Sequence, residues 1–119
     1  MTTSTYQYIN LEYLDLMTDG DNDMKQVMLD MLFEELPQEL EKMNQLHSTA
    51  DWEELKAVSH KMKSTMAFVG NEEMTEANKE IEAILKDGGD KDKVADLLTT
   101  LDNYQSKVIS ELKIEYNKL

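Results

Sequence analysis

The chain has 119 residues, 40% of them hydrophobic, and a formal net charge of −13 with twelve lysines and no arginine. This length suits one domain with a single core, and the composition is too apolar for a disordered tail. The acidic balance disfavours a nucleic-acid surface, and the lack of cysteine excludes disulfides and thiol chemistry. No signal peptide or membrane span is visible, so we predict one soluble, cytoplasmic domain over residues 1–119.

The first predicted helix is short, with Asn10 as its N-cap and an end between Thr18 and Gly20. A second helix is predicted to begin near residue 24 and to end between residues 47 and 50. Its apolar residues keep helical phase across Pro37, which predicts one long kinked helix rather than two. We expect most of the methionines to fill the core. The apolar positions of this helix are Met24, Val27, Met28, Met31, Leu32, Leu36, Leu40 and Met43.

The third and fourth predicted helices have start and stop signals. Asp51 with Glu54 three residues later resembles a capping box, and Asn71 is placed to cap the next helix. Gly70 is expected as a left-handed C-cap of the third helix. Residues 88 and 89 are glycines and close the fourth helix.

The last predicted helix has one long apolar stripe, interrupted at Gln105. Four long amphipathic helices joined by short connections predict an all-α fold, an antiparallel four-helix bundle with a short additional N-terminal helix. The stripe consists of Val94, Leu97, Leu98, Leu101, Val108, Leu112, Tyr116 and Leu119.

His60 lies in the one stretch of this acidic chain that gathers positive charge. Residues 55–70 contain three lysines and no Asp or Glu. On a helix advancing about 100° per residue, the apolar residues of this stretch share one side and His60 points to the other. The same projection places Lys56 and Lys63 beside the imidazole, together with small side chains.

An exposed histidine most often only solvates a helix, but these surroundings suit phosphate chemistry. Neutral imidazole is a competent nucleophile, and nearby cations disfavour its protonated form. The same cations would stabilise a dianionic phosphoryl group once it is attached.

The stretch His60-Lys61-Met62-Lys63-Ser64, followed by Val69-Gly70, resembles the core motif of the histidine-containing phosphotransfer (HPt) domains of bacterial and plant phosphorelays. The similarity extends to residues 10–14, 33–37 and 51–55, so that nearly the whole chain is covered. It implies that His60 is the phosphoacceptor, Lys63 the cation beside the phosphoryl group and Ser64 the small residue that admits the partner. Ser64 replaces the commoner glycine of the family.

We predict that this face carries the partner contacts, with Lys56, Ala57, Lys61, Ala67 and Phe68 around His60. Phe68 has two possible places, the docking rim, which we favour, or a fold back onto the adjacent helix. No metal site is expected, because His47 and His60 are not at ligand spacing and the acidic residues 19–23 suit a helix start better than a calcium loop.

The resulting hypothesis is a phosphorelay intermediate that carries a phosphoryl group on His60 between receiver-domain aspartates. Expected partners are response-regulator receiver domains and a hybrid sensor histidine kinase, with no nucleic acid and no membrane, and the chain is expected to be a monomer. We predict that it is not an enzyme and needs no cofactor, because nothing resembles a nucleotide-binding loop and the receiver would bring Mg²⁺. The alternatives are a bundle that only binds a receiver or another partner, and a purely structural helical module.

Overall fold

A computed structural model describes residues 6–119. The described chain forms five α-helices and no strand, so the predicted all-α class is confirmed. The helices are α1 (Glu12–Thr18), α2 (Asn22–Ser48), α3 (Trp52–Val69), α4 (Glu72–Asp87) and α5 (Asp92–Tyr116).

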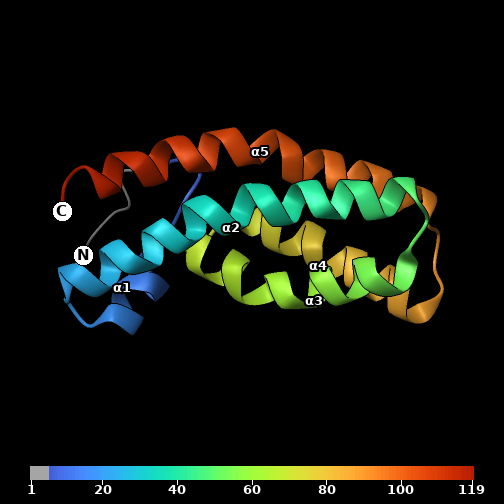
Figure 1. The fold of residues 1–119 in the computed structure, drawn as a ribbon, viewed down its shortest axis with the longest axis horizontal. Coiled ribbons are helices and arrows are strands. Elements are labelled where there is room, and N and C mark those ends of the chain that lie inside the picture. Colours follow the sequence, from blue (N-terminus) through green and yellow to red (C-terminus); the bar gives the residue numbers. More distant parts are fainter. Residues whose placement is uncertain (1–5) are drawn as a thin grey trace.

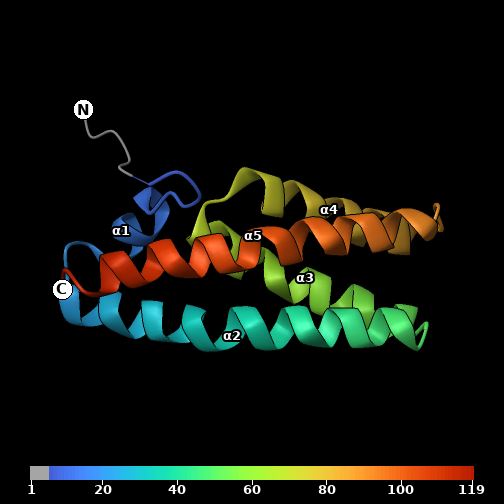
Figure 2. The same cartoon turned by 90° about the horizontal axis from the view of Figure 1, so that it is seen from above.

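The four long helices lie side by side and alternate in direction along the chain (Figure 1). Helix α2 packs against α3 and α5, and α4 packs against the same two helices, so that each long helix has two neighbours. The molecule measures 42 × 25 × 22 Å, and its long axis matches the length of α2, about 40 Å at 1.5 Å per residue. Helix α1 packs on α2 and α3 near one end of the molecule (Figure 2).

Side-chain caps begin three of the helices. Asp21, Asp51 and Asn71 each accept a hydrogen bond from the backbone N–H three residues later, which satisfies one free donor of α2, α3 and α4. The reciprocal half of the predicted capping box is absent at α3, because the N–H of Asp51 donates to the carbonyl oxygen of Leu46 at 2.9 Å.

The first helix ends at Thr18, as predicted, but its N-terminal end differs from the prediction. It begins at Glu12, whose N–H donates to the side chain of Asn10 at 2.9 Å, and its N-cap residue is Leu11. The left-handed C-cap that follows Thr18 is Asp19, and Gly20, which was expected to end the helix, comes one residue later with a positive φ of 79°.

One hydrophobic core runs between the long helices, and α2 continues without interruption through Pro37. Each long helix contributes a stripe of buried aliphatic side chains, whose burial is the main source of stability. The fully buried large side chains are Leu14, Leu29, Leu32, Leu36, Leu40, Met43, Leu55, Met62, Met66, Met74, Ile81 and Leu101.

The prediction for the first turns of α2 was wrong in part. Met24, Val27 and Met31 are 50%, 65% and 37% exposed, and Leu29 takes the core position. The eight apolar positions of this helix spread over about 220° at 100° per residue, more than its neighbours α1, α3 and α5 cover. Leu119 was also assigned to the core, but it lies beyond the end of α5 and is exposed.

The N-terminal segment (residues 6–11) is held against α5 by one carboxylate. Glu111 accepts backbone hydrogen bonds from Gln7, Tyr8 and Ile9, at donor–acceptor distances of 2.9, 2.6 and 3.1 Å. The side-chain amide of Asn71 donates to the carbonyl oxygen of Tyr8 at 2.8 Å, so the same segment is tied to the start of α4.

Gly70 is required where the N-terminal segment crosses the end of α3. Its φ of 74° is the left-handed C-cap that the sequence predicts. A Cβ atom at this position would collide with the carbonyl oxygen of Asn10, whose N–H donates to the carbonyl oxygen of Val69 at 3.1 Å.

Lys25 joins three helices beneath the N-terminal segment. Its side chain is only 11% exposed, and its Nζ lies 2.7 Å from Asp15 on α1 and 2.6 Å from Glu115 on α5. The hydroxyl of Tyr6 donates to the other oxygen of Glu115 at 2.7 Å. Burial, followed by this hydrogen bond and the charges of Glu115 and Glu111, raises the pKa of Tyr6 to about 12.

Candidate functional site

His60 projects from the middle of α3 into solvent, as predicted. Its side chain is 68% exposed, whereas Val58, Met62 and Met66 of the same helix are buried. Asp51 and Gly70 fix the two ends of this helix, so His60 stands on a rigid element about two turns from either terminus.

Glu82 of α4 orients the imidazole. Its Oε2 lies 2.6 Å from Nδ1 of His60, and its side chain is 18% exposed. A carboxylate accepts a hydrogen bond, so we assign the proton of the neutral ring to Nδ1. The lone pair is then on Nε2, which no described residue contacts by a hydrogen bond. The arrangement therefore presents one nucleophilic nitrogen to solvent.

A buried polar pair sets the register between α3 and α4 next to this contact. The hydroxyl of Ser59 lies 2.9 Å from Oδ1 of Asn78, and the amide of Asn78 donates to the carbonyl oxygen of Ser59 at 2.9 Å. Both residues are almost fully buried, so an unpaired group there would be costly. Ser59 precedes His60, and Asn78 lies one helical turn before Glu82, so this pair positions both members of the site.

Lys63 approaches the same carboxylate from the next turn of α3. Its Nζ lies 3.6 Å from Oε1 of Glu82, and its side chain is 53% exposed. Burial alone would raise the pKa of Glu82, but the hydrogen bond with His60 and the charge of Lys63 outweigh burial and lower the pKa below its ordinary 4.5. Glu82 is therefore ionised at neutral pH, and its contact with the half-exposed Lys63 is a long one.

The other two lysines near His60 are paired with acidic residues. Lys61 contacts Glu39 of α2 at 2.5 Å, and Lys56 contacts Glu53 of its own helix at 3.7 Å. The basic cluster of the sequence is therefore largely neutralised in three dimensions, because α2, α4 and the first turn of α3 place carboxylates beside residues 55–70, which have none of their own.

Small side chains leave the imidazole accessible. Ala57, Ser64 and Ala67, at three- and four-residue steps along α3, are all exposed, as predicted. Phe68 is half-buried and stacks on Tyr13 of α1, with 5.2 Å between ring centroids and an interplanar angle of 29°. Phe68 thus folds onto the adjacent helix, the alternative that the prediction ranked second.

Glu82 is the residue of the site that sequence reasoning missed. It lies 22 positions after His60 on a different helix, outside the motif around the histidine. Within residues 6–119, no group of three or more His, Asp or Glu side chains is arranged to hold a metal ion.

Comparison with known proteins is consistent with this geometry. The family model of the Hpt domain matches residues 27–115. The fold is similar to the crystal structure of the HPT domain from the Hpt sensor hybrid histidine kinase from Shewanella, with a TM-score of 0.78 and 22% sequence identity. That similarity covers 93% of this chain and 95% of the other. The comparison with curated proteins gave no match.

Proposed function

Because this chain belongs to the Hpt domain family, we propose that it is a histidine phosphotransfer protein of a multistep two-component phosphorelay, built as a four-helix bundle. His60 carries the phosphoryl group between the aspartates of receiver domains. The observation that supports this role is the exposed imidazole whose Nδ1 is bound to Glu82 and whose Nε2 faces solvent.

The proposed step is a displacement at phosphorus. The lone pair of Nε2 attacks the phosphoryl group of a receiver aspartyl phosphate, so that a P–N bond forms, the P–O bond to the aspartate breaks, and the aspartate leaves as a carboxylate. The imidazole becomes positively charged, with its proton still on Nδ1, and Glu82 stabilises that charge at 2.6 Å. The reverse step delivers the phosphoryl group to a second receiver.

Lys63 supplies charge stabilisation on this side of the reaction. Its contact with Glu82 is long, at 3.6 Å, and its side chain is half exposed, so it is able to turn towards a dianionic phosphoryl group on His60. Mg²⁺ and most of the transition-state stabilisation would come from the receiver. This chain thus contributes a positioned nucleophile rather than a complete active site, in keeping with Hpt domains being phosphocarrier modules rather than enzymes.

The proposed docking surface is centred on Ser64, whose small side chain lets the receiver approach His60. Ala57 and Ala67 extend it along α3, with Lys56 and Lys61 at its edges. Phe68 contributes through its stack on Tyr13, which continues the surface onto α1. Because the edge lysines are already paired, contact area close to His60 should matter more for affinity than net attraction between the two proteins.

Several further predictions concern the partners, oligomeric state, cofactor and location of the protein. We propose receiver domains and a hybrid sensor histidine kinase as partners, a monomeric state, no bound cofactor and a cytoplasmic location. None of the helices in residues 6–119 is long and apolar enough to cross a lipid bilayer.

The test is transfer of label from a phosphorylated receiver. Receiver domains of the source organism are phosphorylated with a labelled small phosphoryl donor and mixed with this protein. We expect the label to leave one receiver rapidly and to appear here in acid-labile, alkali-stable form. His60→Gln should abolish the transfer, whereas His47→Gln, at the only other histidine, should not. Stable binding without transfer would instead show that the protein only docks its partner.

A further inference from the structure

Exposed apolar side chains are concentrated on α1 and the first turns of α2, two helices that pack against each other. Eight large hydrophobic residues of the described chain are exposed, and six of them lie on α1 and the first turns of α2. This surface, called here the methionine surface, consists of Tyr13, Leu16, Met17, Met24, Val27 and Met31.

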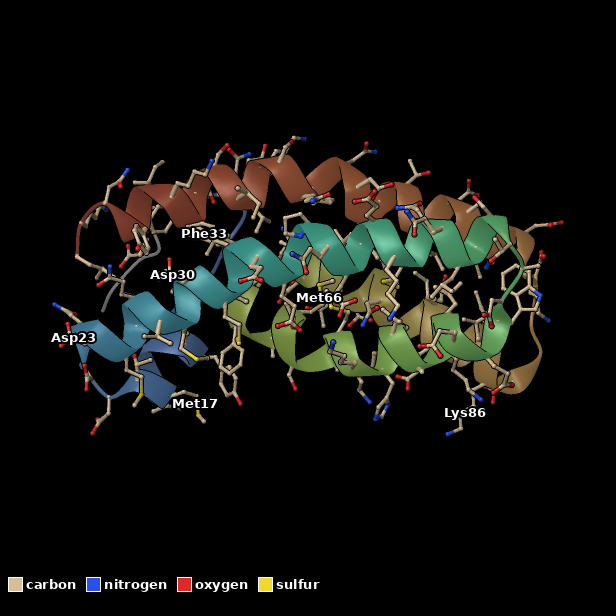
Figure 3. All side chains as sticks on the ribbon, viewed as in Figure 1. Met17, Asp23, Asp30, Phe33, Met66 and Lys86 are labelled. Atoms are coloured by element: carbon tan, nitrogen blue, oxygen red, sulfur yellow. The ribbon has the colours of Figure 1, made fainter. Side chains whose placement is uncertain are left out.

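The methionines of the chain divide sharply by exposure. Met43, Met62, Met66 and Met74 are buried, and Met28 is half-buried. Met17, Met24 and Met31 are 53%, 50% and 37% exposed, and all three belong to the methionine surface. Figure 3 shows Met66 between the helices and Met17 at the end of the molecule that α1 occupies.

Thioethers are the only sulfur groups available for oxidation, because the chain has no cysteine. Oxidation of methionine requires access of the oxidant to sulfur, and it converts an apolar side chain into a polar, chiral sulfoxide. The three exposed methionines are therefore the ones open to an oxidant, and the four buried ones are protected by the core. Met1 lies outside the described residues.

The methionine surface adjoins the surface around His60 at two points. Met31 lines a surface hollow together with Lys61, the residue after His60, and Glu39, its ion-pair partner. Tyr13 stacks on Phe68 of α3, and Met17 follows Tyr13 by one helical turn. A partner that covers His60, Ser64 and Phe68 would therefore meet the methionine surface at Tyr13 and Met31.

We propose that Met17, Met24 and Met31 are sites of reversible oxidation to methionine sulfoxide, and that this oxidation weakens docking of the receiver domain. The second half rests on the proposed phosphotransfer function. With hydrogen peroxide as the oxidant, each sulfur gains one oxygen atom and loses two electrons. The peroxide O–O bond breaks, an S–O bond forms and one molecule of water is released.

The effect on docking follows from hydration. A sulfoxide oxygen is a strong hydrogen-bond acceptor, and covering it with an apolar partner surface removes its water without offering a donor. Docking onto a sulfoxide should therefore cost affinity, whereas the fold should persist because the core methionines stay reduced. Oxidation of these methionines would thus make the rate of phosphotransfer through His60 depend on the concentration of oxidant.

The first experiment tests the sites. The folded protein is treated with increasing hydrogen peroxide, digested and analysed by peptide mass spectrometry, with the protein unfolded in denaturant as the reference. We expect sulfoxide at residues 17, 24 and 31 well before residues 43, 62, 66 and 74, and similar rates at all seven in the unfolded chain. Equal rates at the two groups in the folded protein, or protection of the three exposed residues, would overturn the assignment.

The second experiment tests docking with the receiver that transfers fastest. After mild oxidation we expect a roughly tenfold rise in the receiver concentration that gives half-maximal transfer, with an unchanged melting temperature. Methionine sulfoxide reductases should reverse the rise. The triple variant Met17→Leu, Met24→Leu, Met31→Leu keeps an apolar surface that cannot be oxidised, so its transfer should be insensitive to peroxide.

The outcomes separate the two proposals. Equal transfer by the oxidised and the untreated protein, or equal peroxide sensitivity of the triple variant, overturns the regulation by oxidation. Failure of the untreated protein to accept phosphate from any receiver overturns the proposed function and the docking half with it. The peptide analysis decides the oxidation sites in either case.

Discussion

Glu82 and Glu115 are surrounded by the same kinds of group but serve opposite purposes. Glu82 binds the ring of His60 at 2.6 Å and Lys63 at 3.6 Å, and Glu115 binds the hydroxyl of Tyr6 at 2.7 Å and Lys25 at 2.6 Å. The two carboxylates are similarly covered, with 18% and 16% of their side chains exposed.

The difference lies in their partners. His60 and Lys63 are 68% and 53% exposed, whereas Lys25 is 11% exposed and Tyr6 is half-buried. Around Glu115 the ion pairs of Lys25 connect three helices, and its charged groups are too covered to meet another molecule. Around Glu82 the carboxylate fixes one edge of the imidazole, and the other edge and the lysine remain available to a visiting protein. Burial of the partners, more than the type of contact, therefore separates the stabilising cluster from the reactive one.

The largest effect should come from Gly70→Ala, which destabilises the same end of the molecule that Glu115 stabilises. The new Cβ would be strained at φ 74° and would collide with Asn10, so we expect a loss of about 3 kcal/mol in the free energy of unfolding. Gly88→Ala is the matched control, because Gly88 has the same φ and open space around it, and should lose only about 1 kcal/mol. Denaturant unfolding measures both, and equal losses would show that the contact with the N-terminal segment contributes nothing.

Glu82→Ala should affect transfer rather than stability. Without the carboxylate, the ring has no fixed tautomer and no counter-charge, so we expect the transfer rate to fall roughly 100-fold with little change in melting temperature. Glu82→Gln keeps a hydrogen-bond acceptor and should retain an intermediate rate. An unchanged rate in Glu82→Ala would remove Glu82 from the mechanism.

Glu115→Gln should show the reverse pattern. We expect a loss of about 1 to 2 kcal/mol in the free energy of unfolding at neutral pH, because Lys25 loses a charged partner, with an unchanged transfer rate. Burial would raise the pKa of Glu115, but the hydrogen bonds from Lys25 and Tyr6 outweigh it and lower the pKa below 4.5.

The pH dependence of this difference follows from the lowered pKa. A carboxylic acid whose pKa is lower in the folded than in the unfolded protein contributes stability at pH values above its unfolded-state pKa. For Glu115 this contribution is lost as the pH falls from about 4.5 through the folded-state pKa. The gap between the native protein and Glu115→Gln should therefore narrow below about pH 4.5. Urea unfolding between neutral and acidic pH measures this difference in the free energy of unfolding. A difference that stays constant would contradict the lowered pKa of Glu115.

The smallest effect is expected for Lys61→Ala. Lys61 is 61% exposed and paired with Glu39, so its removal should change the free energy of unfolding by no more than about 0.5 kcal/mol. Its positive charge is already neutralised, and we expect transfer to change less than in Lys63→Ala. A larger loss of transfer in Lys61→Ala would mean that the receiver displaces Glu39 and binds this lysine directly.

The sequence was most informative where one helix alone determines the outcome. The exposure of His60 and the caps at Asp51, Gly70 and Asn71 depend on local helical phase and local backbone bonds, and all of these were predicted. The sequence overestimated the positive charge around His60, because Glu39 and Glu82, which offset it, come from other helices.

Glu82 could have been found only with the register between α3 and α4. The short turn at Gly70 and Asn71 makes the two helices antiparallel neighbours, which places residues near 80 opposite His60. The turn does not decide which of them points at the imidazole. The buried Ser59–Asn78 pair decides it, and such a pair becomes visible only when both helices are in place.

The first turns of α2 show a different limit. Their apolar residues were assigned to the core because apolar residues at helical spacing usually form a buried stripe. When the stripe is wider than the surface that the neighbouring helices cover, some of its residues are exposed. Hydrophobic pattern alone does not distinguish a core methionine from one on a binding surface.

The most direct test of the central claim identifies the ring nitrogen that carries phosphorus. The protein is phosphorylated with a small phosphoryl donor and analysed by phosphorus and nitrogen NMR with nitrogen-labelled histidine. Because Glu82 binds Nδ1, we predict phosphorus on Nε2 of His60 with the proton retained on Nδ1. Phosphorus on Nδ1, phosphorylation of another residue in its place, or a His60 that takes up no phosphate would contradict the account.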